Sequence, residues 1–424
     1  MVRSSHWGCV AAASSTSESP KTSKGMFMRK VGMAVVLLSA GLALPAISSQ
    51  AVQAEGPGVG SPWVVSLGDS YISGEGGRWA GNSNSSSASV DAGGSAAYFD
   101  NATRTAETIN RCHRSTAAEI HIGGGVNSLN LACSGARTAT FTSSDGYFKP
   151  GIDFYASGAN QGQALMLQNF AATHNVTMIQ LSIGGNNFNF SDIIQTCVTN
   201  FLTSPSWWPN YCNDDSSVTA NFTSAKVTAQ TNAILGAINN IKTAMTNAGY
   251  SASQYTIVQQ TYPSPVPNGS GFRYSQSGYT RQNTGGCGFW NNDANWANST
   301  ALVKINNAVK GAAASAGVKV LDLAASFNGR RLCESTVNLM ENSGRANWTV
   351  AGASDSTEWI AQIRTVSTVF GPYYVQESLH PNWWGEKAIR NCVRQAYNGG
   401  AVRGGACNRG TGLNANGEPN MTVV

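Results

Sequence analysis

The chain has 424 residues, of which 42% are hydrophobic and only 12% are charged. This composition excludes a disordered polyelectrolyte, and the length is sufficient to bury a large core. The formal charge of +5 does not indicate nucleic-acid binding, because five of the 27 basic side chains but only one of the 22 acidic ones lie in residues 1–54. The rest of the chain is nearly neutral, so we expect no nucleic-acid partner.

Residues 1–54 have the pattern of an N-terminal extension that ends in a secretory signal peptide. The basic pair Arg29-Lys30 precedes an apolar run over 31–47, and short side chains follow up to Ala54. The alternative is a membrane anchor, but the run has 17 residues, against ~20 for a membrane span. We therefore predict cleavage near Ala54, secretion, and a single domain with long loop insertions over 55–424.

Short apolar runs alternate with amphipathic stretches along the remaining chain. In order, they predict a strand over 63–67, a strand over 128–132, a helix over 159–174, a strand over 177–183, a helix over 223–248, a strand over 255–260, a helix from 302 to near Gly317, a strand over 318–323 and a helix over 384–397. This alternation predicts an α/β fold with a parallel sheet of about five strands, which binds ligands beyond the carboxyl ends of its strands. Three long stretches without periodicity, 78–102, 201–222 and 263–298, indicate functional surface or stapled insertions.

Eight cysteines follow the predicted signal, and an even number in an exported chain favours disulfides. Short loops lose the least entropy on closure, so we predict sequential pairing. The expected pairs are Cys112–Cys133, Cys197–Cys212, Cys287–Cys333 and Cys392–Cys407. The alternative is a metal site, which lacks support because no Cys-x-x-Cys or His-x-x-x-His occurs. We expect neither a metal nor an organic cofactor.

Four short motifs follow predicted strands or lie in a late loop. Gly68-Asp69-Ser70-Tyr71 follows the first strand, Ser134-Gly135 the second, and Gly184-Gly185-Asn186 the third. The fourth, Glu377-Ser378-Leu379-His380-Pro381-Asn382, places a carboxylate three residues before one of the few histidines. Carboxyl ends of parallel strands meet at one edge of a sheet, where a serine, a base and amide donors form a nucleophilic site. The Gly-x-Ser-x-Gly elbow of α/β-hydrolases is absent from the sequence.

These motifs, in this order, resemble the SGNH (GDSL) hydrolases. Cys112-His113-Arg114-Ser115 and the motif that contains His380 are similar to the secreted actinomycete lipase and esterase branch. The resemblance extends over about 63–397 and implies a three-layer α/β/α sandwich with flavodoxin-like strand order. It also implies that the protein hydrolyses esters with a serine nucleophile.

The resemblance assigns roles to particular residues. Ser70 is the expected nucleophile and His380 its general base, while the backbone amides of Ser70 and Gly135 and the side chain of Asn186 form the oxyanion hole. Glu377 is the expected triad acid, although many family members have Asp there. The alternative is a backbone carbonyl, from Ser378 or Glu377, which orients the imidazole in some members.

The resulting hypothesis is a secreted serine ester hydrolase that acts on carboxylic esters, in particular lipid or phospholipid acyl esters, through an acyl-enzyme on Ser70. We expect a monomer that binds a small-molecule or lipid ester and contacts a lipid–water interface. Two alternatives remain open. One is a carbohydrate acetylesterase, favoured by Trp- and Asn-rich loops such as those with Trp207-Trp208 and Trp383-Trp384. The other is a non-catalytic protein that binds carbohydrate or a surface on the same fold.

Overall fold

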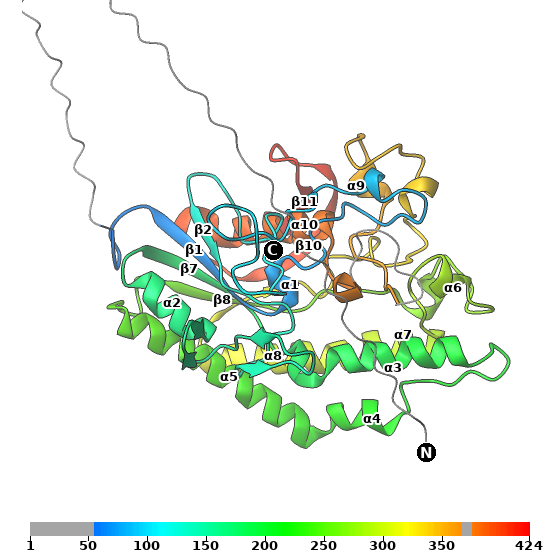
Figure 1. Ribbon diagram of the computed structural model, residues 1–424, viewed down its shortest axis with the longest axis horizontal. Coiled ribbons are helices and arrows are strands. Elements are labelled where there is room, and N and C mark those ends of the chain that lie inside the picture. Colours follow the sequence, from blue (N-terminus) through cyan, green and yellow to red (C-terminus); the bar gives the residue numbers. More distant parts are fainter. Residues whose placement is uncertain (1–54, 366–374) are drawn as a thin grey trace, which may run out of the picture. The chain divides into compact units, whose positions relative to one another are not determined.

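The structure is a computed structural model that describes residues 55–365 and 375–424 (Figure 1). The predicted signal peptide over 1–54 lies outside the described residues. The helices are α1 (Ser70–Ser73), α2 (Gln163–Ala171), α3 (Phe190–Thr203), α4 (Ser216–Thr219), α5 (Ser224–Asn247), α6 (Thr280–Asn283), α7 (Asn291–Trp296), α8 (Leu302–Ala316), α9 (Ala353–Ser356) and α10 (Trp383–Tyr397). The strands are β1 (Pro62–Gly68), β2 (Asn127–Asn130), β3 (Phe141–Thr142), β4 (Phe148–Lys149), β5 (Ala156–Ser157), β6 (Asn160–Gln161), β7 (Asn175–Ser182), β8 (Thr256–Gln260), β9 (Lys319–Asp322), β10 (Gly405–Leu413) and β11 (Pro419–Val423).

One mixed sheet forms the centre of the fold, with the strand order β11-β10-β9-β8-β7-β1-β2. All neighbouring strands from β10 to β2 are parallel, and only β11 runs antiparallel to its neighbour. The sheet has seven strands where the sequence predicts about five. The two additional strands form the C-terminal hairpin, whose first strand has the sequence GACNRGTGL and lacks an apolar pattern. The five predicted strands correspond to β1, β2, β7, β8 and β9.

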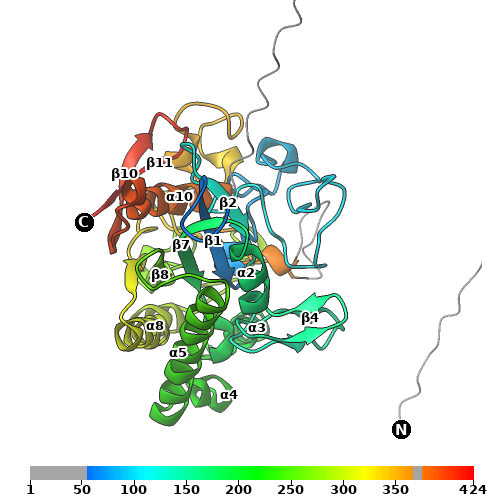
Figure 2. The same cartoon turned by 90° about the vertical axis from the view of Figure 1, so that its left-hand side faces the viewer.

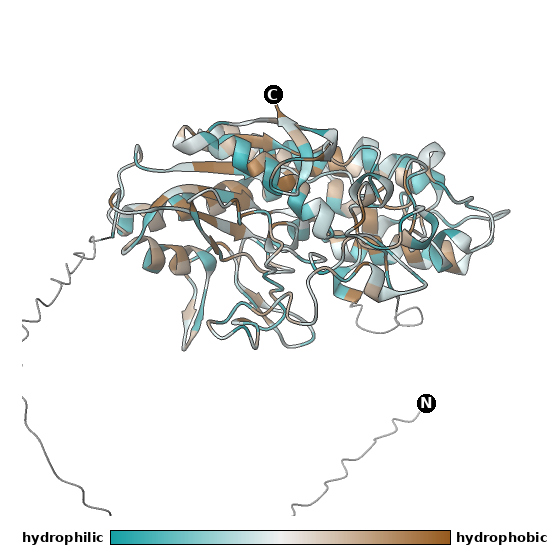
Figure 3. Cartoon of the chain, turned by 90° about the horizontal axis from the view of Figure 1, so that it is seen from above, coloured by the Kyte–Doolittle hydropathy of each residue, from teal (hydrophilic) through white to brown (hydrophobic). Residues whose placement is uncertain are grey.

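Helices cover both faces of this sheet. Helices α2, α5 and α8 lie on one face and α10 on the other (Figures 1 and 2). Strands β1 and β7 are buried almost throughout because Val64, Val65, Ile179 and Leu181 are fully enclosed between these layers. Hydrophobic residues accordingly concentrate on the central strands (Figure 3). The architecture is the α/β sandwich that the sequence predicts.

The four predicted helices correspond to α2, α5, α8 and α10. No sequence pattern predicts a helix over 190–203, where the structure has α3. Its buried residues include Ile193, Cys197, Val198 and Phe201, a helical spacing that is masked by the polar residues between them. The helix ends just before Ser204-Pro205, where proline disfavours helical backbone at the preceding residue. Because α3 follows the third motif, it lies next to the candidate site.

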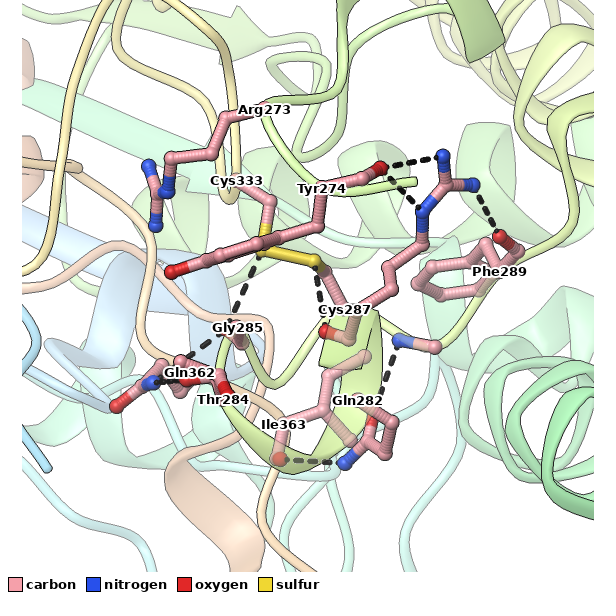
Figure 4. The surroundings of a disulfide bond; sticks show 12 residues. Arg273, Tyr274, Gln282, Thr284, Gly285, Cys287, Phe289, Cys333, Gln362 and Ile363 are labelled. Carbon is pink, nitrogen blue, oxygen red and sulfur yellow. Dashed lines mark hydrogen bonds between the residues drawn. A yellow bond between two sulfur atoms is a disulfide. The ribbon is translucent and has the colours of Figure 1, made fainter. Parts of the chain in front are cut away.

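Four disulfides join the cysteines in the sequential pattern: Cys112–Cys133, Cys197–Cys212, Cys287–Cys333 and Cys392–Cys407. The Cys287–Cys333 bond ties the long stretch 263–298 to the loop around Cys333 (Figure 4). Next to it, Gln282 donates to the carbonyl of Ile363 at 3.1 Å, and the Ile363 amide donates to Gly286 at 2.8 Å. This stretch is therefore fixed to the rest of the fold by a disulfide and by hydrogen bonds. Among the described residues, no helix is long and apolar enough to cross a membrane.

Candidate active site

Strand β1 ends at Gly68 and delivers Ser70 to the first position of helix α1. The φ of Gly68 is +142°, and a Cβ at this position would overlap the carbonyl of Ser182 on β7. Only glycine therefore allows the two strand ends to lie this close. Asp69 then caps α1 by accepting a hydrogen bond from the Tyr71 amide at 3.1 Å. Ser70 is 6% exposed and lines a cavity.

His380 reaches this serine from the opposite end of the chain. Its Nε2 lies 2.7 Å from the Ser70 Oγ, within hydrogen-bonding distance. The loop that carries it is fixed by Tyr71, whose hydroxyl donates to the Leu379 carbonyl at 2.8 Å. Burial lowers the pKa of His380, although the charge of Glu75 partly opposes this effect. At neutral pH the imidazole is therefore uncharged and able to accept the serine proton.

Gly135 and Asn186, the other two expected oxyanion-hole residues, line the same cavity as Ser70 and His380. Gly135 has a φ of +79°, and Asn186 is anchored through a bond from its Nδ2 to the Ala136 carbonyl at 3.0 Å. Within residues 55–365 and 375–424, the backbone amides of Ser70 and Gly135 donate to no protein group. Two free amides and a side-chain amide around one serine are a suitable arrangement for an oxyanion.

Glu377 makes no hydrogen bond to the imidazole within the described residues, whereas a triad acid would be expected to bond to Nδ1. The residue is 2% exposed, and its carboxylate accepts hydrogen bonds from Trp79 Nε1, at 2.7 Å, and from the Tyr98 hydroxyl. Nδ1 of His380 is buried and makes no hydrogen bond in the described part of the chain. The backbone of Glu377 and Ser378 acts to raise the pKa of His380, against the larger effect of burial. We therefore propose the alternative, in which a main-chain carbonyl orients the imidazole.

A second acidic residue, next to the serine, is linked by hydrogen bonds to the loop that carries Asn186. Asp69 is buried, and its carboxylate accepts a hydrogen bond from the Tyr262 hydroxyl. That hydroxyl in turn accepts from the Gly185 amide at 2.9 Å, next to Asn186. Burial raises the pKa of Asp69 to about 7, against the effect of the Tyr262 hydrogen bond. The sequence patterns do not single out Tyr262, since a lone tyrosine after a strand carries no signal.

The cavity has a volume of about 700 Å³ and two unlike walls. Strand β2 lies on one side of β1, while β7 and β8 lie on the other. On the β7–β8 side the wall is largely apolar and includes Phe190, Ile194, Val198, Leu202, Pro265, Leu302 and Ile305. On the β2 side it is polar and includes Arg111, Ser134, Asp145, Tyr147 and Lys149. An ester with one apolar and one polar part fits this asymmetry.

The tryptophan pairs occupy different environments, and neither lines the cavity. Trp207 and Trp208 are 81% and 74% exposed on the loop after α3. Trp384 is buried, and its ring packs edge-on against Trp383 with 4.5 Å between the centroids. Across the two described ranges, no group of three or more His, Cys, Asp or Glu residues could hold a metal ion.

Comparisons with known proteins find solved structures only. No family model and no curated protein matches the chain. An extracellular lipase from Streptomyces rimosus has 19% identity and a TM-score of 0.40, over 77% of this chain and 95% of that one. A phospholipase A1 from Streptomyces albidoflavus has 19% identity and a TM-score of 0.39, over 81% and 100%. A carbohydrate acetylesterase from Sinorhizobium meliloti has 11% identity and a TM-score of 0.29, over 66% and 92%.

These three proteins are ester hydrolases. All three identities lie below 20% and all three TM-scores below 0.5.

Proposed function

We propose that this chain is a secreted serine hydrolase of carboxylic esters, with a single domain over 55–424. The observation that carries the proposal is the 2.7 Å contact between Ser70 Oγ and His380 Nε2 in the cavity. A serine hydroxyl is barely ionised at neutral pH, and a neutral imidazole in contact with it is the usual means of activation. The free amides of Ser70 and Gly135 and the side chain of Asn186 complete the arrangement.

In this mechanism, Ser70 Oγ attacks the ester carbonyl while its proton passes to His380 Nε2. The negative charge that develops on the carbonyl oxygen is stabilised by the two backbone amides and Asn186 Nδ2. The intermediate collapses, the C–O bond to the alcohol breaks, and His380 returns the proton to the departing alcohol oxygen. Water then attacks the acyl-enzyme with the same base, which releases the carboxylic acid and regenerates Ser70.

The walls of the cavity support a lipid or phospholipid acyl ester as the substrate. Apolar residues of α3 line the cavity from Phe190 to Leu202, which corresponds to about 18 Å along the helix axis. An acyl chain that follows α3 is removed from water along this length. On the other side of Ser70, Arg111 and Lys149 offer positive charge next to Asp145. A polar or charged alcohol portion fits this side.

The test combines a covalent label with a substrate panel. An organophosphonate should add one label per molecule to the wild type and to Ser73→Ala, but none to Ser70→Ala. Ser73 is the matched control, because it is a buried serine on the same helix that does not contact His380. Turnover of p-nitrophenyl acyl esters should also disappear in Ser70→Ala with the melting temperature unchanged. Labelling or turnover that survives in pure Ser70→Ala contradicts the nucleophile.

The same panel separates the alternative functions. Phospholipid vesicles and long-chain acyl esters should be hydrolysed faster than acetylated sugars, because the apolar wall along α3 has no role with an acetyl group. Faster turnover of acetylated sugars would favour a carbohydrate acetylesterase. Absence of any label in the folded wild type would favour the non-catalytic binding protein.

A further inference from the structure

A buried carboxylate lies between the segment that carries Ser70 and the one that carries His380. Helix α1 ends at Ser73 and is capped by Gly74, and the next residue, Glu75, is 0% exposed. The following residue, Gly76, packs on the histidine segment. A Cβ at Gly76 would come within 2.8 Å of the Pro381 carbonyl and 3.5 Å of the His380 Cβ. The loop with Glu75 therefore lies directly against the backbone of the proposed base.

The Glu75 carboxylate is fixed by hydrogen bonds on both of its oxygens. Oε1 lies 2.6 Å from Nδ1 of His113, and Oε2 accepts from Nε2 of Gln376 at 3.1 Å. Gln376 belongs to the 3₁₀ turn that leads to His380, and its Nε2 also lies 2.8 Å from the Ser134 Oγ. One side chain thus links Glu75 to the base segment and to the residue before Gly135. The carboxylate cannot rotate away without breaking these bonds.

The surroundings keep this carboxylate charged. Burial alone would raise the pKa of Glu75, but the charge and hydrogen bond of His113, together with the charge of His380, lower it to about 2. The other titratable groups around it are Lys149, Tyr98 and Glu107, and Glu107 lies 3.4 Å from the second ring nitrogen of His113. His113 is thus flanked by two carboxylates, and burial alone would lower its pKa, but the charge of Glu75 raises it.

The charge of Glu75 also acts on His380. Burial lowers the pKa of His380, and among the effects that oppose burial the charge of Glu75 is the largest. The positive charge of His113 acts in the opposite sense and is weaker than that of Glu75. The net effect of the Glu75–His113 pair at His380 is therefore that of a negative charge.

We propose that Glu75 is a positioning residue that stabilises the His380 imidazolium electrostatically, in place of a carboxylate on Nδ1. The inference rests on the proposed function, in which His380 becomes positively charged each time it takes a proton from Ser70. No carboxylate contacts its Nδ1 in the described part of the chain, and Glu377 is bound to Trp79 and Tyr98. In a medium of low dielectric constant, a fixed negative charge close to the ring stabilises the cation without touching it.

The first experiment compares two substitutions that each remove one carboxylate from His113. For Glu75→Gln we expect the acid limb of kcat/KM against pH, measured with a soluble short-chain ester, to move to lower pH. We expect kcat to fall about tenfold, the change that corresponds to one pKa unit, with KM unchanged. Glu107→Gln is the matched control, and its acid limb should coincide with that of the wild type. An unmoved acid limb in Glu75→Gln, or an equal shift in both variants, overturns the proposal.

The second experiment does not depend on turnover. In Ser70→Ala, the His380 ring should titrate at a higher pH by NMR than in Ser70→Ala/Glu75→Gln, and equal values overturn the proposal whether or not the chain hydrolyses esters. Turnover that survives in Ser70→Ala would instead contradict the proposed function and leave this comparison intact. If Glu75→Gln does not fold, the double substitution Glu75→Gln/His113→Gln, made in the Ser70→Ala background, removes both charges and leaves neither partner unpaired. The His380 ring in that protein should still titrate at a lower pH than in Ser70→Ala alone, and an unchanged titration contradicts the proposal.

Discussion

The carboxylate of Glu377 is bound to Trp79 and Tyr98 and makes no hydrogen bond to the ring of His380 in the described part of the chain, although only two residues separate them in the sequence. Glu377 accepts hydrogen bonds from Trp79 and Tyr98, both on the long stretch 78–102, while the His380 ring faces Ser70. The acid therefore fastens a distant loop to the histidine segment. Without a bond to the ring in the described part of the chain, it has no contact through which to set the tautomer of the imidazole.

Neutralising Glu377 should accordingly affect stability more than catalysis. For Glu377→Gln we expect kcat/KM on a soluble short-chain ester to fall by less than tenfold, because the main-chain carbonyl proposed to orient His380 remains in place. Urea unfolding should show a loss of about 1–3 kcal/mol, since two buried donors lose a charged acceptor. A loss near the ~10⁴ known for a neutralised triad acid in a serine protease would restore Glu377 to that role.

The sequence predicts what depends on local pattern and misses what depends on distant side chains. Val64, Val65 and Leu67 form an apolar run that identifies β1, and the motif after that run locates Ser70. The direction of the Glu377 side chain is different, because it is determined by Trp79, 298 positions away in the chain. The contact between Glu75 and His113 likewise joins residues 38 positions apart, so the motif that contains His113 does not reveal it. Strand β10 was not predictable from pattern, since glycine and asparagine replace the apolar residues of an ordinary strand.

Asn186 should contribute to the rate rather than to substrate binding. For Asn186→Ala we expect kcat to fall by about 10²–10³ with KM nearly unchanged, the usual effect of losing one oxyanion donor. Asn187→Ala is the control, because its side chain is paired with Thr138 on both atoms, at 2.8 and 3.1 Å, and does not line the cavity. It should largely retain kcat. Equal losses in the two variants would mean that Asn186 only supports the turn.

The apolar wall along α3 should determine acyl-chain preference. Ile194 lines the cavity about one helical turn beyond Phe190, so Ile194→Trp should block longer chains there. We expect kcat/KM to fall for long-chain p-nitrophenyl esters and to change little for the acetyl ester. Thr196→Trp places the same side chain on the opposite face of α3 and should leave the chain-length profile unchanged. If both variants or neither of them shift the profile, the acyl chain does not follow α3.

A pair of buried carboxyl groups, one of them on α10, should make the protein less stable as pH rises. Glu119 and Glu386 are both 0% exposed, and the Glu119 amide donates to the Glu386 carboxylate at 3.1 Å. Burial raises the pKa of both well above the ordinary value, although the charge of Arg390 opposes it. Above the unfolded pKa of about 4.3, the unfolded chain releases protons that the folded protein retains. The free energy of unfolding therefore decreases as pH rises toward the folded pKa values.

Replacing one acid of this pair with its neutral isostere should remove part of that dependence. The free energy of unfolding of Glu386→Gln minus that of the wild type should be higher at pH 8 than at pH 5. We expect this difference to rise by at least about 1.4 kcal/mol, the equivalent of one pKa unit. Urea unfolding at the two pH values measures this difference, in which the contributions of titrating groups common to both proteins, such as Asp69, cancel.

Glu418→Gln is the matched control, because Glu418 is also buried against α10 but is paired with Arg394. That substitution leaves Arg394 without its partner, so it should destabilise the protein at both pH values. If Glu386→Gln is equally destabilised at pH 5 and pH 8, the pair is ionised in the folded protein and the argument from burial is wrong.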